Sequence, residues 1–228
     1  MTVEVNGILV AAHELKGPLA LMRQLALSLD EQNLTKTQAQ MVSVSERALR
    51  QVTDLSKIAR LEDGLFQLEP VAVRAVCDDV SRELSQLFAS NRRVLDVSYH
   101  NKMRLVLANR DLLHSIIYNF CINALHYSDT ESHSRLTVRD HKNSVRINIR
   151  DYGPALPVNV WRQIKTHQLN QPTSIAMRPG SSGLGLYIAS KFSHYLHANV
   201  SAVRHRDGTS FLLDLPVSTQ TMLPLDKI

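Results

Sequence analysis

Residues 111–128 read DLLHSIIYNFCINALHYS, and this stretch decides the fold of the C-terminal part of the chain. Apolar side chains fill most of its positions, which is typical of a helix that is buried on nearly every side. Asn119 and Asn123 lie four residues apart and therefore share one face of that helix. Burying two carboxamides without partners is costly, so we expect Asn119 and Asn123 to line a cleft or to bind a ligand.

Segments with strand and helix periodicity surround this helix. The pattern predicts strands at 93–99, 103–108, 136–139, 145–150, 199–204 and 210–215, and helices at 71–89, 110–127 and 184–197. Strands in one layer and helices in the other predict a two-layer α/β sandwich over residues 65–217, followed by a loose tail at 218–228. Residues 154–182 contain several prolines and no sustained period, which favours a functional lid or a mobile segment.

The N-terminal part, residues 1–64, has the pattern of a helical hairpin. In the first helix the two apolar rows of a heptad repeat begin at Ile8 and Ala12. In the second helix the predicted rows are Met41, Ala48 and Leu55 against Ser45, Val52 and Ala59. Two narrow stripes bury too little surface on their own, so we expect a homodimeric four-helix bundle through residues 7–61. The alternative is that both helices pack on the rest of the chain.

Composition excludes several classes of protein. The 228 residues include 26 Lys and Arg against 21 Asp and Glu, and these charges are scattered, which argues against a nucleic-acid partner. Cys77 and Cys121 are far apart in apolar surroundings and are expected to be buried thiols of a reducing compartment. No stretch has the length of a membrane span. We therefore expect a cytoplasmic segment without membrane contact, either independent or the cytoplasmic part of a membrane-bound sensor.

The first helix carries a candidate nucleophile in the sequence HELKGPL, residues 13–19. His13 follows the seam residue Ala12, so its imidazole projects beside the seam, and Glu14 next to it can accept a proton. Pro18 removes a helical hydrogen bond and predicts a kink at the turn that carries His13. An exposed histidine is most often only a surface residue, so this interpretation requires a source of phosphate elsewhere in the chain.

Two glycine-containing stretches have the features of a site for a ligand that carries phosphate. DYGPALP (151–157) follows a predicted strand, where the carboxylate of Asp151 can accept a hydrogen bond from an exocyclic amino group and Gly153 lets the backbone approach closely. GSSGLGL (180–186) opens a helix, whose free N–H groups suit phosphates, although the Leu184 side chain also fits a core position. Carboxamide oxygens of asparagine suit Mg²⁺, and His126 continues their face with a possible phosphate contact.

Taken together, these motifs resemble the catalytic core of a bacterial sensor histidine kinase over nearly the whole chain. Residues 1–64 resemble the dimerisation and histidine phosphoacceptor hairpin, and 65–217 the ATP-binding catalytic domain of the gyrase/histidine-kinase ATPase type. HELKGPL matches the phosphoacceptor motif, Asn119 and Asn123 the asparagine box, and Asp151 and Gly153 the first glycine box. Gly183 and Gly185 match the second glycine box, and Gly208–Phe211 resembles the closing strand motif that contains Thr209.

The resemblance implies a role for each of these residues. Asp151 would recognise the adenine amino group beside Tyr127 and Thr209, and Asn123 with Asn119 would hold Mg²⁺ on the phosphates of ATP. The phosphates would meet His126 and the helix start formed by Gly183, Leu184 and Gly185. His13 would attack the γ-phosphate with Glu14 as general base, and would pass the phosphoryl group to an aspartate of a response regulator receiver domain.

Departures from the family pattern keep other functions open. Ala155 and Ser181 replace box glycines, and Trp161 and Ile164 stand where a phenylalanine pair is common in the lid. One alternative is therefore a histidine phosphotransfer (relay) protein whose catalytic-like domain is degenerate and does not bind ATP. A pure ATPase is a further alternative, but it leaves the His13 motif unexplained.

Overall fold

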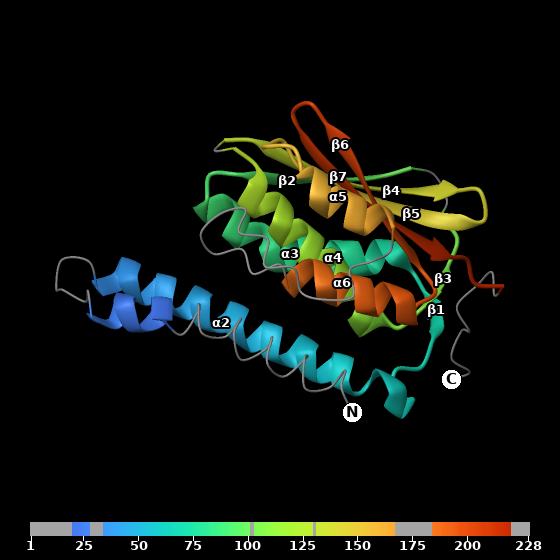
Figure 1. Cartoon of the computed structure of the whole chain (residues 1–228), viewed down its shortest axis with the longest axis horizontal. Coiled ribbons are helices and arrows are strands. Elements are labelled where there is room, and N and C mark those ends of the chain that lie inside the picture. The colour runs from blue at the N-terminus through green and yellow to red at the C-terminus, as the bar shows by residue number, and fades with distance from the viewer. Residues whose placement is uncertain (1–19, 28–33, 101–102, 130, 167–183, 220–228) are drawn as a thin grey trace, which may run out of the picture. The chain divides into compact units, whose positions relative to one another are not determined.

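The structure, a computed structural model, describes residues 20–27, 34–100, 103–129, 131–166 and 184–219. The described residues fall into two compact units. One contains residues 20–27 and 34–63, and the other contains nearly all described residues from Gly64 onward. Figure 1 labels their helices and strands.

The first unit consists mainly of the long helix α2 (Leu34–Ala59), which is followed by the short 3-10 helix η1 (Leu61–Asp63). The predicted row of Met41, Ala48 and Leu55 lies on the covered side of α2, where Ala48 is buried and the other two are half-buried. In the predicted opposing row, Ser45 is half-buried and Val52 and Ala59 are exposed in the single chain, so burial of this row in a homodimer stays a prediction. The covered side is completed instead by Thr37, Val44, Gln51 and Ile58.

Heptad spacing alone is satisfied by two candidate rows on α2. Residues 44, 51 and 58 and residues 45, 52 and 59 lie three and four positions after the first row, and both spacings keep side chains on one side of a helix. Only packing decides between them. In the first helix, residues 20–27 are helical, and the other residues of the predicted seam lie outside the described residues.

A five-stranded sheet forms the base of the second unit, in the order β2-β4-β5-β7-β6. These strands are β2 (Val94–Tyr99), β4 (His133–His141), β5 (Ser144–Arg150), β6 (Asn199–His205) and β7 (Gly208–Pro216). Strand β2 runs parallel to β4, and the other neighbouring strands are antiparallel. A separate two-stranded sheet pairs β1 (Glu69–Val71) with β3 (Val106–Ala108).

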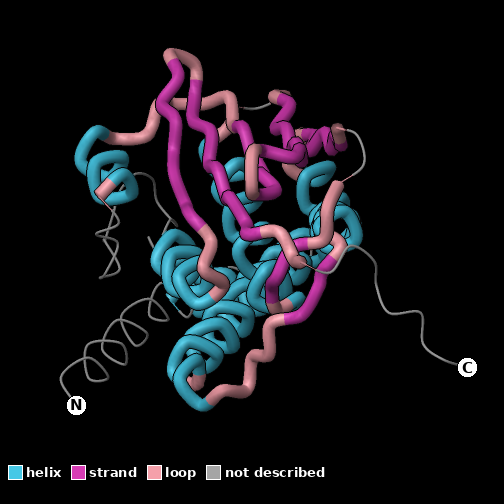
Figure 2. The backbone as a smooth tube through the Cα atoms, turned by 90° about the vertical axis from the view of Figure 1, so that its right-hand side faces the viewer, coloured by secondary structure: helices cyan, strands magenta, loops and turns pink. Residues whose placement is uncertain are grey.

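Helices cover one face of the five-stranded sheet and form the second layer, as Figures 1 and 2 show. They are α3 (Val73–Ser90), α4 (Arg110–Tyr127) and α6 (Leu184–Tyr195). Strand β5 shows why the core lies on this side: Val145, Ile147 and Ile149 are completely buried and alternate with half-buried polar residues. Phe120 of α4 stacks on Phe211 of β7 with ring centroids 5.2 Å apart. The predicted two-layer sandwich is confirmed for this unit.

Short elements account for most differences from the sequence prediction. Helix α5 (Val158–Lys165) lies in the segment expected to be irregular, because eight residues are too few to establish a period. The predicted strand at 103–108 is reduced to β3, and β1 was not predicted at all. Near the expected tail, Val217 bridges Val106 and the N–H of Ser218 donates to the carbonyl of Leu105.

Two further predictions concern the cysteines and membrane-spanning helices. Cys77 and Cys121 are buried thiols, as expected. Within the described ranges, the helices are all too short or too polar to cross a membrane.

Candidate functional site: the end of strand β5

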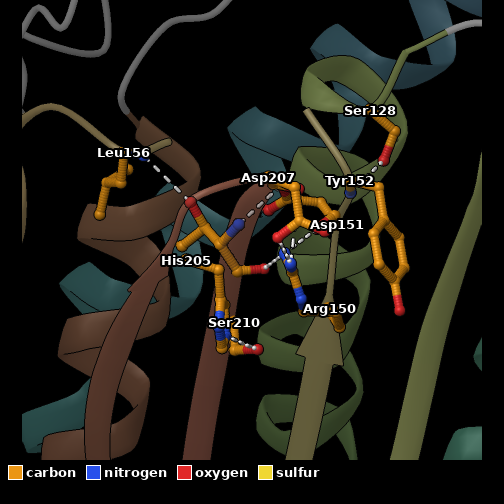
Figure 3. A network of polar contacts seen from close by, with 9 residues as sticks. Ser128, Arg150, Asp151, Tyr152, Leu156, His205, Asp207 and Ser210 are labelled. Atoms are coloured by element: carbon orange, nitrogen blue, oxygen red, sulfur yellow. Dashed lines mark hydrogen bonds and ion pairs between the residues drawn. The ribbon is translucent and has the colours of Figure 1, made fainter. Parts of the chain in front are cut away.

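Asp151 (Figure 3) follows the last residue of β5, and Thr209 at the start of β7 is hydrogen-bonded to it twice. The N–H of Asp151 donates to the carbonyl of Thr209 over 2.9 Å, and the N–H of Thr209 donates to Oδ1 of Asp151 over 3.0 Å. The hydroxyl of Thr209 in turn accepts the N–H of Leu156 over 3.1 Å. Thr209 therefore fixes both the carboxylate and the loop that follows it.

The carboxylate of Asp151 is removed from water, with only 2% of the residue exposed. This burial raises its pKa to about 6, although the Thr209 N–H and the charge of Arg150 both act to lower it. Asp151 is thus ionised at neutral pH in a site of low polarity. A carboxylate can accept several hydrogen bonds, so the bond from Thr209 leaves acceptor capacity for an amino group of a ligand.

Close backbone approaches around Asp151 allow only glycine at two positions. A Cβ atom on Gly153 would lie 1.7 Å from the carbonyl oxygen of Tyr127, at the end of α4. Gly208 has a φ of +134°, and a Cβ there would lie 2.3 Å from the carbonyl oxygen of Asp151. The structure therefore brings Gly153 against Tyr127, and the turn at Gly208 against Asp151.

A pair of buried serines supports the same loop and was not predicted from the sequence. The hydroxyl of Ser128 accepts the N–H of Tyr152 over 3.3 Å and lies 3.1 Å from the hydroxyl of Ser134. The carbonyl of Tyr152 accepts the N–H of Asp129 over 3.1 Å. Serine is too common in loops for the sequence to signal this role.

Asn119 and Asn123 share one face of α4, as predicted, but their amides differ. The Nδ2 group of Asn119 donates to the carbonyl of Ser115 over 2.8 Å, and a Cβ on Gly185 would lie 3.0 Å from its Oδ1. The Nδ2 atom of Asn123 is buried and has no hydrogen-bond partner. Such an atom is costly to leave unpaired, and Asn123 is therefore the residue of the pair whose amide still requires a ligand.

The remaining predicted residues are placed less directly. His126 and Tyr127 are half-buried in the last turn of α4. Leu184 is completely buried, so its side chain is a core residue and only its backbone can serve a ligand. Gly183, His13 and Glu14 lie outside the described residues.

Arg150 is a second residue that the sequence did not identify. Its position in a strand predicts an outward-facing side chain, yet its guanidinium bends towards the site and contacts Asp151, Thr209 and Asp207. Its only sequence signal is that it directly precedes Asp151.

The two departures in the predicted lid belong to α5. The indole Nε1 of Trp161 donates to the carbonyl of Ala202 on β6 over 3.0 Å, and Ile164 is buried. These side chains hold α5 on the edge of the sheet.

Residues 108–219 match the family described as histidine kinase-, DNA gyrase B- and HSP90-like ATPases. Over 214 residues, 90% of the chain, the sequence is 24% identical to the histidine protein kinase SaeS of Staphylococcus epidermidis. The chain spans 61% of the length of that relative.

Solved structures share the fold. The histidine kinase AdeS of Acinetobacter baumannii matches 91% of the chain with a TM-score of 0.65 and 15% identity, and 98% of that structure is covered. Full-length ShkA, solved in complex with AMPPNP, matches 96% of the chain with a TM-score of 0.64 and 21% identity, and 47% of that structure is covered.

Proposed function

We propose that the chain, whose residues 108–219 match the histidine kinase-, DNA gyrase B- and HSP90-like ATPases, is an ATP-dependent protein-histidine kinase of a two-component system. The observation that carries this proposal is the buried carboxylate of Asp151, held by Thr209 at the end of β5. Sequence similarity to SaeS, which is named a histidine protein kinase, extends over the N-terminal unit as well.

In this proposal Asp151 accepts a hydrogen bond from the 6-amino group of adenine. Adenine offers a donor at that position where guanine has a carbonyl oxygen, so a carboxylate there selects adenine. Tyr127 forms part of the wall around the base, because its carbonyl is in direct contact with Gly153. Thr209 keeps the carboxylate oriented before the nucleotide arrives.

The phosphates are proposed to lie along α4 towards the start of α6. Gly183, Leu184 and Gly185 would offer backbone N–H groups, and His126 a polar contact. The carboxamides of Asn123 and Asn119 fit a magnesium ion because their oxygens are hard ligands, and the buried, unpartnered Nδ2 of Asn123 can donate to a phosphate oxygen. Bound there, Mg²⁺ would neutralise phosphate charge.

His13 is the proposed phosphoacceptor. Its neutral imidazole nitrogen attacks the γ-phosphorus, the bond to the bridging oxygen breaks, and ADP leaves with the electron pair. Glu14 accepts the proton that the imidazole loses. The N–P bond then breaks as a carboxylate oxygen of the response regulator's aspartate attacks, which returns His13 to its free form.

We also propose that the chain forms a homodimer through its helical hairpin. Helix α2 exposes Val42, Leu49 and Val52, with 50%, 67% and 40% of each residue accessible. Val42, Leu49 and Ser56 repeat every seven residues along one exposed stripe, and Val52 and the half-buried Ser45 lie between them. A second copy presents the same stripe, and pairing of the two would bury it in a four-helix bundle.

The proposal is tested by incubating the protein with γ-labelled ATP and Mg²⁺, with His13→Gln as the matched variant. We expect acid-labile label on the wild type and none on His13→Gln. A relay protein would bind no ATP but would accept phosphate at His13 from a phosphorylated regulator. A pure ATPase would release phosphate equally in both proteins.

A further inference from the structure

Arg150 has an unusual environment for a charged residue at a strand end. Only 12% of its side chain is exposed. Its Nη1 donates to the carbonyl of Asp151 and, over 3.4 Å, to the carbonyl of Thr209. Its Nη2 donates to Oδ1 of Asp207 over 2.6 Å, and the guanidinium lies over the ring of Tyr152, 4.5 Å from its centroid. One side chain therefore contacts four residues around the candidate adenine site.

These contacts join two segments that are distant in sequence. Asp207 and Gly208 form the turn between β6 and β7, whereas Asp151 and Tyr152 follow β5. Figure 3 shows the Arg150 side chain between Asp207 and Asp151. Because Gly208 has no side chain, the turn lies so close that a Cβ there would be 2.5 Å from Nη1 of Arg150. The guanidinium thus fills the space between turn and loop.

Other arginines on the same strands lack this connection. Arg146 points to the same side of β5 and makes a two-bond ion pair with Asp214 of β7, at 2.6 and 2.7 Å, away from the site. Arg135 is directly opposite Arg150 on β4 and is exposed. The link to Asp151 is therefore a property of Arg150 and not of arginine on this face.

We propose that Arg150 is a positioning residue for nucleotide binding: it holds the β6–β7 turn on the Asp151 loop, so that the Thr209 N–H stays bonded to the carboxylate that meets adenine. This inference rests on the proposed function for the identity of the ligand. The positioning itself is a property of the protein without nucleotide, which allows the two to be tested separately.

The charge of Arg150 has a second consequence for Asp151. Burial raises the pKa of Asp151, and the nearby guanidinium acts to lower it, so loss of the charge moves the pKa further up. Other charged or titratable groups around this loop include Asp207 in the turn, Asp129 after α4, His205 on β6, and Arg204 on β6, which donates to the carbonyl of Leu156 over 2.7 Å. Replacement of Arg150 by lysine keeps the charge but removes the planar fork that contacts two segments at once.

The first experiment compares Arg150→Met with Arg146→Met, which removes an ion pair of the same strand and face but touches nothing in the site. Amide hydrogen exchange at Thr209 is measured in nucleotide-free protein, and binding of AMPPNP is measured by calorimetry. We expect faster Thr209 exchange and about tenfold weaker binding in Arg150→Met only. Equal effects in both variants, or no effect in either, would overturn the proposal.

Asp207 provides a second test that leaves the core untouched, because 70% of its side chain is exposed. Asp207→Ala should speed Thr209 exchange and weaken AMPPNP binding in the wild-type background, but should add little to Arg150→Met. Additive effects of the two substitutions would contradict the proposed link. Arg150→Lys should leave the pH midpoint of binding in place while weakening binding, whereas Arg150→Met should move the midpoint upwards.

Separate readouts keep the two proposals distinct. If wild-type protein binds no AMPPNP, the proposed function fails, while Thr209 exchange still reports on Arg150. If the wild type binds AMPPNP but Thr209 exchange is unchanged in Arg150→Met and in Asp207→Ala, only the positioning role fails.

Discussion

Asp151 and Thr209 are joined by two hydrogen bonds in opposite directions, backbone N–H to carbonyl over 2.9 Å and backbone N–H to carboxylate over 3.0 Å. The first bond continues the pairing of β5 with β7 by one residue. The second bond, from the Thr209 N–H, orients the buried carboxylate of Asp151. The candidate site is thus built into the end of the sheet, and its chemistry depends on one carboxylate.

The raised pKa of Asp151 predicts a pH-dependent affinity for ATP. Below its pKa of about 6 the carboxyl is protonated and loses an acceptor for the adenine amino group. We expect affinity to be constant above pH 7 and to fall by up to about tenfold per pH unit below 6. Calorimetry from pH 5 to 8 measures this, and Asp151→Asn should show no such midpoint. An unchanged profile in that variant would assign the titration to another group.

The same burial predicts a stability gain in Asp151→Asn. The pKa of Asp151 is higher in the folded protein than the value of about 3.9 in an unfolded chain, so protonation favours the folded state. In the wild type, the contribution of Asp151 to the free energy of unfolding therefore decreases as the pH rises from 4 through 6. We expect Asp151→Asn to be more stable than the wild type at pH 7, by up to about 3 kcal/mol, and the gain to vanish near pH 4. Urea unfolding of both proteins at pH 7 and pH 4 measures whether the variant is the more stable one.

Gly153→Ala should destabilise the protein more than Gly185→Ala. A Cβ at residue 153 meets main-chain atoms of Tyr127 at 1.7 and 2.6 Å, which cannot move without disturbing α4. At residue 185 the nearest atom is Oδ1 of the Asn119 side chain at 3.0 Å, which can rotate. We expect losses of about 3 kcal/mol or more for Gly153→Ala and about 1 kcal/mol for Gly185→Ala by chemical denaturation. Similar losses in the two variants would contradict the packing at Tyr127.

Asn123→Ala should separate metal dependence from folding. The variant loses an amide whose Nδ2 is buried without a partner, so its free energy of unfolding should be unchanged or slightly higher. Affinity for ATP should depend on Mg²⁺ in the wild type and become insensitive to Mg²⁺ or EDTA in Asn123→Ala. Full retention of the Mg²⁺ effect would assign the metal to other residues.

Substitution in the exposed stripe of α2 should dissociate the proposed dimer. Leu49→Glu places a charge where 67% of an apolar residue is accessible in the single chain. We expect a dimer for the wild type and a monomer for Leu49→Glu by sedimentation. A monomeric wild type would favour a different partner for the stripe.

Periodicity predicted the second unit well because its long elements are strongly apolar on one side. Helix α4 has the predicted limits, and β5 alternates as expected along its whole length. Helix α5 was missed because its two buried residues, Val160 and Ile164, give a single helical spacing. On α2, two candidate seam rows satisfy the same heptad spacing, and only contacts with a partner helix distinguish them.

Sequence motifs identified the residues that form the candidate site. They did not identify the residues whose contacts hold the loop and the turn of that site in place. Asp151, Gly153 and Thr209 stand out by type and position, and the structure brings them together. Arg150 and Ser128 act through the geometry of a loop and a turn, which lie more than 50 and 20 residues apart from their partners in sequence. Such long-range contacts leave no periodic signal.

The central claim is that the carboxylate of Asp151 binds the amino group of adenine. It is tested most directly by titrating the wild type and Asp151→Asn with AMPPNP and Mg²⁺ at pH 7.5. We predict one binding site per chain in the wild type and about a tenfold to hundredfold loss of affinity in the variant, which remains folded. Binding of equal strength in both proteins, or no binding to the wild type, would contradict it.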